Sequence, residues 1–234
     1  MPVLALDIES TSVDPETARI VTIALVLADD DGTVLKSQEW LVRPDGYEIP
    51  ADATAVHGIT TEHARLYGKP LQVVIPQVRR VLVEEWTTDV PLVIFNSPYD
   101  LSVLDREFRR VTLGVLGFDL DGPVLDPYVL DQRLVPKRRG KGSRRLQAVA
   151  EAYNVPLSAD EAHGATADAL AAARIALKQL DSDLLRGIPL QVIHEAQIGW
   201  KRDQAYELTA YFRSVGNGEH VNAEWPLIEW KGEA

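Results

Sequence analysis

The spacing of apolar residues changes along the chain, and its opening part predicts β-strands. Residues 3–8 form an apolar run interrupted by Asp7, and residues 19–28 form a second run rich in β-branched side chains. The second run ends near Asp31-Gly32, a pair that suits a tight hairpin, so residues 34–42 are expected to return antiparallel. The chain is therefore predicted to open with a three-stranded antiparallel meander.

Helical spacing follows an irregular crossing at residues 43–69, where one short helix is expected after Thr61. The helices beyond it are expected at residues 73–86, 98–111, 128–134, 144–153, 167–180 and 190–215, with short buried strands at residues 92–95 and 124–126. Ser97, Ser143 and Thr166 are the expected N-caps of three of these helices.

This order of elements predicts an α/β fold, in which a mixed sheet combines the antiparallel meander with parallel strands and is flanked by helices. Residues 187–189, Gly-Ile-Pro, are the best candidate for a boundary. We expect one domain at residues 1–182 and, at residues 188–234, a C-terminal helix and aromatic tail packed on it.

Composition is that of a soluble globular protein, with 46% hydrophobic and 25% charged residues in a chain of 234. The absence of cysteine excludes disulfides, thiolate metal ligands and a cysteine nucleophile. The sequence begins directly with the first strand and has no apolar stretch near 18 residues, so we expect a cytoplasmic protein without a membrane partner.

The formal net charge of −11 argues against a nucleic-acid partner, but the positive charge is unevenly distributed. We name residues 137–145 the basic loop, because six of these residues are basic and none is acidic. Such a loop either binds phosphates, in which case activity should fall steeply with salt, or is a solvated loop whose like charges repel. Lys137, Arg138 and Arg139 are the candidate phosphate-binding residues.

Two carboxylates, Asp7 and Glu9, interrupt the first apolar strand. Side chains of a strand alternate between its faces, so both point the same way, with Cα atoms roughly 6.6 Å apart at two strand rises. Either they face water at an exposed strand end, or they lie on a buried strand and hold a cation. The surrounding apolar residues favour the buried strand.

Two further acids stand where they can join the first pair. Asp100 and Asp168 are each expected in the first turn of a helix, and the ends of these elements can meet at one edge of a layered sheet. Four carboxylates there would bind hard divalent ions, Mg²⁺ or Mn²⁺. Two such ions about 3.5–4 Å apart would suit hydrolysis of a phosphodiester, with His163 as general base.

The arrangement resembles the DnaQ-like, DEDD-type 3′-to-5′ exonucleases, in the subgroup (DEDDh) that has a histidine five residues before the last aspartate. The motifs that carry the resemblance are residues 7–11, 96–100 and 163–168, in this order along the chain. The resemblance implies a ribonuclease H-like fold. In it, Asp7, Glu9 and Asp168 would hold the metal that activates water, and Asp7 would bridge to a second metal that Asp100 reaches.

The resemblance also implies contacts to the terminal nucleotide near Ser10, Thr11 and His57, and we place Asn96 with them. Phe95 departs from the family, whose members commonly carry a histidine at this position. Its ring is expected to pack in the core, or alternatively to stack on a base. Asp126 is expected to be structural, and His194 and His220 to be ordinary surface residues.

The leading hypothesis is a metal-dependent 3′-to-5′ exonuclease that acts on single-stranded or frayed 3′ ends of DNA in replication, proofreading or repair. Two alternatives remain: an exoribonuclease acting on short or structured RNA, and a catalytically silent module that binds nucleic acid or a polymerase. The C-terminal helix carries apolar residues that either pack on the domain or dock a DNA polymerase or a second copy; these are Ile193, Trp200, Leu208, Tyr211 and Phe212.

Overall fold

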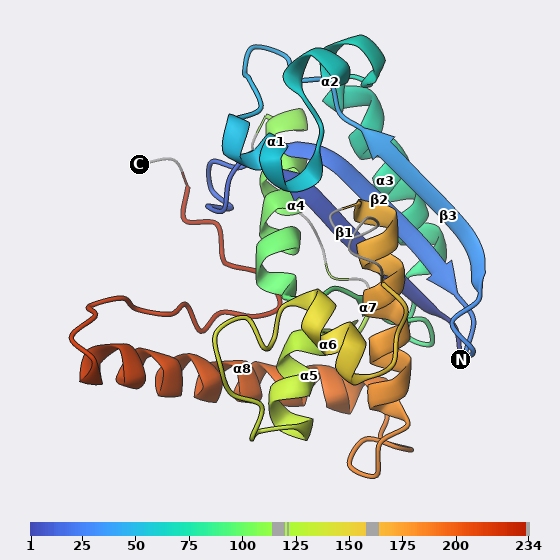
Figure 1. Cartoon of the computed structure of the whole chain (residues 1–234). Helices are drawn as coiled ribbons and strands as arrows, with labels where there is room; N and C mark the ends of the chain where they lie inside the picture. Colours follow the sequence, from blue (N-terminus) through green and yellow to red (C-terminus); the bar gives the residue numbers. More distant parts are fainter. Residues whose placement is uncertain (114–119, 121, 158–163, 233–234) are drawn as a thin grey trace.

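The fold is built on one mixed sheet of five strands, three of which, β1, β2 and β3, are labelled in Figure 1. The computed structural model describes residues 1–113, 120, 122–157 and 164–232. The strands lie in the order β3-β2-β1-β4-β5. Their bounds are Val3–Ser10 (β1), Ile20–Ala28 (β2), Val34–Leu41 (β3), Leu92–Val93 (β4) and Val124–Leu125 (β5).

The strand directions confirm the predicted fold class. β2 pairs antiparallel with both β1 and β3, which forms the meander, and β4 and β5 extend the sheet in parallel from β1. The β2–β3 turn places Gly32 at a φ of 77°, a left-handed conformation that glycine adopts without strain. The Asp-Gly pair therefore makes the hairpin that the sequence predicts.

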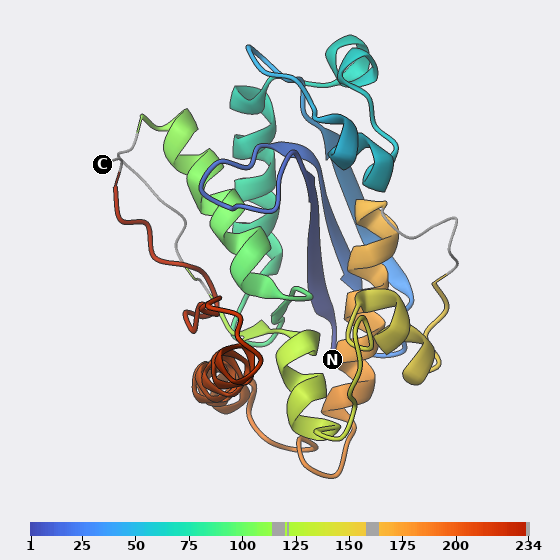
Figure 2. The same cartoon turned by 60° about the vertical axis from the view of Figure 1, so that its left-hand side comes forward.

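Helices cover both faces of the sheet, as Figure 2 shows, with α3 and α4 on one side and α7 on the other. In chain order, the helices are Ala51–His57 (α1), Thr61–Tyr67 (α2), Leu71–Glu85 (α3), Ser97–Val111 (α4), Pro127–Leu134 (α5), Leu146–Ala152 (α6), Ala165–Leu180 (α7) and Leu190–Ser214 (α8). β1 is covered on both faces, as its apolar run predicts.

The alternation along β1 decides which helix each of its side chains meets. Leu4, Leu6 and Ile8 lie in the core cluster that includes residues of α3 and α4. Val3 and Ala5 lie in the second cluster, together with the alanines of α7. Because these alanines are small, α7 lies close on the sheet, and the odd-numbered face of β1 continues past Ala5 toward the start of α7.

Several predicted details of the helices are wrong. α1 was not expected; its sequence has no apolar stripe, and none of its residues is buried. The N-caps are Asn96 for α4, Arg145 for α6 and Gly164 for α7, in place of the three predicted hydroxyl caps. Asn96 adopts a left-handed conformation with φ of 65°, which turns the chain sharply from β4 into α4.

The first half of α8 covers the open edge of the sheet at β5. The Val124 N–H donates to Nδ1 of His194 at 2.9 Å, and the Gln197 amide donates to the Val124 carbonyl at 3.0 Å. The Gln197 side chain also accepts from the Asp126 N–H at 2.8 Å. The expectation that His194 is an ordinary surface residue is therefore wrong, because its ring accepts a backbone hydrogen bond that a neighbouring strand would otherwise accept. His220 is exposed, as expected.

The second half of α8 differs from the first. Leu208 is 38% exposed and Tyr211 58% exposed, so the predicted apolar stripe is only partly buried. After α8, the chain turns back and runs along α4 (Figure 1), where Trp225 is buried and the Ile228 N–H donates to Ser102 Oγ at 2.8 Å. Among the residues that the structure describes, no helix has the length and apolarity needed to cross a membrane.

Candidate active site

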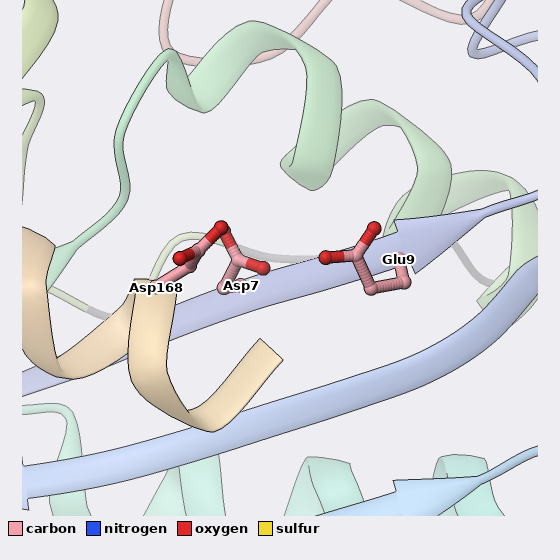
Figure 3. A group of neighbouring side chains, drawn as sticks. All are labelled: Asp7, Glu9 and Asp168. Atoms are coloured by element: carbon pink, nitrogen blue, oxygen red, sulfur yellow. The ribbon is translucent and has the colours of Figure 1, made fainter. Parts of the chain in front are cut away.

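Three carboxylates converge where β1 ends beside the start of α7. Asp7 and Glu9 lie on the face of β1 that meets α7, and Asp168 lies in the first turn of that helix. Figure 3 shows the carboxyl groups of Asp7 and Asp168 close together, with Glu9 turned toward them. One carboxylate oxygen of each residue lies within 4.8 Å of those of the other two. Hard oxygen donors at this spacing suit a divalent cation.

Asp100 approaches the same place from the opposite side. It lies in the first turn of α4, and its Oδ1 accepts the Ile8 N–H at 3.0 Å, which fixes it against β1. Asp100 lines the same hollow of about 400 Å³ as the other three acids, but it is not part of the group within 4.8 Å. The four predicted acids therefore share one site, with three of them forming its tight centre.

Burial, together with the repulsion between neighbouring carboxylates, opposes ionisation of the acids in the site. Burial, followed by the nearby charges of Asp100, Asp168 and Glu9, holds the pKa of Asp7 well above its usual range. Burial, followed by Asp168 and Glu39, raises the pKa of Glu9 to about 7. The pKa of Asp100 is also raised, chiefly by burial. A divalent cation would relieve this repulsion, so the residues present fit a metal site.

Asp126 positions the second motif rather than joining the site. Its carboxylate is fully buried and accepts the N–H groups of Asn96 at 2.8 Å and Ser97 at 3.0 Å, which lie at the start of α4. It also accepts from Tyr128 N at 3.0 Å and from the Trp225 indole at 3.2 Å. These contacts agree with the structural role expected for Asp126.

The remaining predicted substrate residues divide by position. Phe95 and Asn96 line the hollow, with the Phe95 ring packed against the core and edge-on to Tyr128 at 5.9 Å. Thr11 is buried, and its hydroxyl accepts the Arg19 N–H at 2.9 Å. His57 ends α1, and its Nδ1 accepts the Ile59 N–H at 3.1 Å. Neither Thr11 nor His57 lines the hollow.

Ser10 lies beside the site and is bonded to Tyr99, whose hydroxyl also donates to the Ser12 carbonyl. Tyr99 lines the hollow. Burial raises the pKa of Tyr99 to about 12, so it is a neutral donor at physiological pH. His163, the predicted base, lies outside the described residues, which resume at Gly164 immediately before α7.

Three residues of this region were not among the predicted site residues, although one of them, Arg144, belongs to the basic loop. Tyr128 and Arg144 line the hollow, and Glu39 on β3 accepts a hydrogen bond from Thr166 at the start of α7. Tyr128 stands three residues after the end of the last strand, at the same sheet edge as the acids, and this position is the signal that could have identified it. Glu39 has no such local signal, because Thr166 lies 127 positions further along the chain.

The basic loop is held in place by an acid outside it. Arg138 donates to both carboxylate oxygens of Asp131, at 3.0 and 3.2 Å, and Arg144 bonds to the same carboxylate. Asp131 is fully buried, so this triad anchors the loop to α5. Lys137 and Arg139 are exposed. Because the loop is anchored, it does not fit the alternative of a merely solvated loop. Arg138 and Arg144 are already neutralised by Asp131, so the remaining cations of the loop are the ones left for phosphate.

Fold and site together define a class of protein: a ribonuclease H-like domain with a cluster of carboxylates that could hold a metal ion. The family described as Exonuclease (RNase T) matches residues 4–176, and the chain belongs to it. It is a DnaQ-like 3′-to-5′ exonuclease, which confirms the predicted enzyme class.

Named relatives agree with this placement. The DNA polymerase III subunit epsilon of Rickettsia felis is 27% identical over 174 residues, which cover 74% of this chain and 71% of the relative. A DNA polymerase III subunit epsilon-like protein of Rhodobacter capsulatus is 31% identical over 187 residues, covering 79% of this chain but only 24% of the relative.

Solved structures show the same fold. Exonuclease I of E. coli in complex with a dT13 oligonucleotide has a TM-score of 0.61 at 20% identity, covering 89% of this chain. The chain spans only 45% of that exonuclease I chain. Exonuclease X in complex with 5′ overhanging duplex DNA has a TM-score of 0.58 at 20% identity, covering 82% of this chain and 99% of that one.

Proposed function

We propose that this chain removes nucleotides one at a time from the 3′ ends of DNA, using two divalent metal ions, Mg²⁺ or Mn²⁺. The observation that carries the proposal is the convergence of Asp7, Glu9 and Asp168 within 4.8 Å, with Asp100 in the same hollow. Asp7, Glu9 and Asp168 would hold one ion, and Asp7 with Asp100 the other. When bound, such ions lower the pKa of water and stabilise the attacking and leaving oxygens.

The residues of the chain supply the rest of the reaction. A water oxygen forms a bond to phosphorus as the bond from phosphorus to the 3′ oxygen breaks, and His163 is the proposed acceptor of the water proton. The departing 3′ oxygen keeps the bonding electrons, takes a proton from solvent and becomes the 3′-hydroxyl of the shortened strand. Phe95 and Tyr128, which meet edge to face beside the acids, would form an apolar wall for the terminal base. Arg144 lines the same hollow and would face the phosphate.

DNA is favoured as substrate by the relatives, because the epsilon subunits belong by name to DNA polymerase III and both solved exonucleases hold DNA. The same names support a role in replication with a polymerase partner. The family match ends at residue 176, before α8, so the matched segment gives no information on what α8 binds.

Digestion of 5′-labelled single strands tests the proposal. We expect the natural protein to shorten a DNA 20-mer from its 3′ end in Mg²⁺, and Asp7→Ala and His163→Ala to lose a hundredfold or more, roughly the effect expected for removing a metal ligand or a general base. Asp89→Ala, an exposed acid between α3 and β4, is the matched control and should be fully active.

Two results would contradict the proposal. Equal residual activity in the natural protein, Asp7→Ala and His163→Ala would assign the chain to the catalytically silent class. Faster digestion of a matched RNA 20-mer than of the DNA 20-mer would show that RNA is the preferred substrate, since the two strands differ at the 2′-hydroxyl.

A further inference from the structure

A second hollow lies between the basic loop and the far half of α8. It has a volume of about 890 Å³, and Tyr128 and Arg144 line both it and the hollow that holds the four acids. The two hollows therefore meet at these side chains. In Figure 1 the chain between α5 and α6 passes in front of α8, and side chains of both line this hollow. We name this second hollow the α8 groove.

Positive charge dominates one wall of the α8 groove. Five cations of the basic loop line it, against one acid, Glu207 of α8. Arg138 and Arg144 are neutralised by Asp131, whereas Arg139, Lys141 and Arg145 form no ion pair within 4 Å among the described residues. The Asp131 anchor also fixes the loop, so three uncompensated cations are presented by a preformed wall.

Exposed aromatic and apolar side chains form the opposite wall. Tyr211 and Phe212 line the α8 groove with ring centroids 6.0 Å apart, and Tyr211 is 58% exposed. Leu208, at 38% exposure, lies on the same helix one turn before Tyr211. A positive wall facing exposed aromatic rings is the arrangement by which proteins hold single strands, with phosphates on the cations and bases on the rings.

We propose that the α8 groove binds the single strand upstream of its 3′ end, as an extension of the active site. The inference rests on the proposed function, because the strand's terminal nucleotide would occupy the acidic hollow. Arg139, Lys141 and Arg145 bind the phosphates of the upstream nucleotides, and Tyr211 stacks on a base. Arg144 and Tyr128, at the junction, face both segments of the strand.

The charge distribution selects a polynucleotide over a protein partner. The chain carries a net charge of −11, so a concentration of unpaired cations on one wall needs a polyanion to offset its self-repulsion. The α8 side of the groove also lies beyond residue 176, where the family match ends. The aromatic wall of the groove therefore lies outside the segment that the family match covers, and the positive wall lies inside it.

Equilibrium binding without turnover tests the aromatic wall. In EDTA, we measure fluorescence anisotropy of labelled dT20, dT3 and rU20 with the full chain. Tyr211→Ala should weaken dT20 binding about tenfold, as expected for loss of one stacked base, and leave dT3 unchanged. Tyr206→Ala is the matched control, since Tyr206 is 60% exposed on the same helix but does not line the groove; its affinity should stay within twofold.

The salt dependence of dT20 binding tests the positive wall. Replacing both Arg139 and Lys141 by Ala should reduce the slope of log K against log salt by about 1.4, since each single-strand phosphate contact contributes roughly 0.7. Arg79→Ala with Arg80→Ala removes the same charge from exposed positions on α3 and should leave the slope unchanged.

Each outcome bears on one proposal. Equal affinity for dT20 and dT3 in the natural protein, or equal effects of Tyr211→Ala and Tyr206→Ala, would overturn the groove and leave this face of α8 to a protein partner. If either dT20 or rU20 binds more tightly than dT3, and Tyr211→Ala removes this difference, the result supports the α8 groove as a binding site for a single strand. Because the assay involves no cleavage, a chain that binds dT20 through Tyr211 but cuts nothing would contradict the proposed function and not the groove.

Discussion

Glu9 is a carboxylate of the site whose pKa is raised into the physiological range. Its pKa rises from the ordinary 4.5 to about 7, because the side chain is largely buried and faces Asp168 and Glu39. In the metal-free protein, a proton thus occupies Glu9 for roughly half of the molecules near pH 7. Any cation that binds at the site must displace it.

Mg²⁺ binding should therefore release protons and strengthen with pH. Below about pH 7, the apparent affinity should rise up to roughly tenfold per pH unit for each proton released. Isothermal titration calorimetry at pH 6 in two buffers of different ionisation enthalpy measures the number of protons that are released when Mg²⁺ binds. Glu9→Gln should bind Mg²⁺ more weakly and release fewer protons. If the heat of binding is independent of the buffer in both proteins, no proton is released, and the raised pKa of Glu9 is contradicted.

The same shift makes a prediction for stability. The folded pKa of Glu9 lies above its unfolded value, so its contribution is fully present below about pH 4.5 and is lost as the pH rises to about 7. Thermal melts in EDTA should show the natural protein losing stability across this window relative to Glu9→Gln, and Mg²⁺ should restore it. Parallel pH curves for the two proteins would argue against it.

The titration of His194 has the opposite effect on stability from that of Glu9, because it lowers stability as the pH falls. Burial lowers its pKa from the ordinary 6.5, and its Nδ1 accepts the Val124 N–H at the sheet edge. The neutral form is favoured by folding, so the stability that it contributes is present above pH 6.5 and is lost as the pH falls below that value.

Replacing His194 by Ala should cost about 1–3 kcal/mol at pH 7.5, since a buried N–H loses its acceptor. Urea unfolding at pH 7.5 and pH 5 measures both effects. The difference between the natural protein and His194→Ala should shrink at pH 5, because the charged imidazole can no longer accept that hydrogen bond. His220→Ala, at an exposed position after α8, is the control and should be neutral at both pH values.

At the scale of elements, the turn from β4 into α4 depends on one buried acid. Asp126 accepts the N–H groups of Asn96 and Ser97 at the start of α4, and α4 carries Asp100. Asp126→Ala would leave these donors and the Tyr128 N–H without an acceptor. We expect a loss of about 3–5 kcal/mol in the free energy of unfolding, the range for breaking a buried polar network.

Guanidinium unfolding of Asp126→Ala measures that loss, and Asp89→Ala should stay within about 0.5 kcal/mol of the natural protein, as exposed substitutions generally do. A loss below about 1 kcal/mol would mean that water replaces the carboxylate, an outcome at odds with its complete burial.

Elements with a strong local period were predictable from the sequence. The two-residue alternation of β1 puts Asp7 and Glu9 on one face, and the structure brings both to α7 as expected. α1 was missed because a helix that buries no residue has no apolar stripe to read. The caps were misplaced by one to two residues, because several polar side chains and glycines near a helix start compete for that position.

Contacts that join distant segments could not be predicted in this way. The imidazole of His194 meets Val124 from 70 positions away, and no local pattern distinguishes it from a surface histidine. Likewise, Asp131 precedes the basic loop and reads as one acid on a short helix, although it neutralises Arg138 and Arg144. The acids of the site were found because each lies on a recognisable strand or in the first turn of a helix, whereas Glu39 and the α8 groove depend on packing between elements.

At the scale of the whole molecule, the tail after α8 ties three parts of the fold together. Trp225 is 7% exposed, its indole donates to Asp126 at 3.2 Å, and its ring lies 5.0 Å from that of His194. Further along, Arg106 of α4 donates to the Ile228 carbonyl at 2.9 Å. The tail therefore contacts the turn that positions Asp100 and the α8 residue that covers the sheet edge.

If the tail is part of the cooperative unit, Trp225→Ala should lower the stability of the entire chain by about 3–5 kcal/mol, as expected for truncating a buried tryptophan. The loss should appear as one shifted unfolding transition, and amide hydrogen exchange should accelerate at Asn96, Ser97 and Val124. Trp230 provides the matched control, because it is less buried and stacks under Arg109 at 4.3 Å; Trp230→Ala should cost about 1 kcal/mol, typical of an exposed cation–π pair.

The shape of the unfolding curve then separates two descriptions of this molecule. A tail that is docked independently would melt in its own transition when Trp225 is removed, while the main transition and exchange at Val124 would stay in place. A shared transition would instead mean that Asp126, His194 and Trp225 form one network. A double-mutant cycle between His194→Ala and Trp225→Ala should then give a coupling of at least about 0.5 kcal/mol, since residues in contact do not contribute additively.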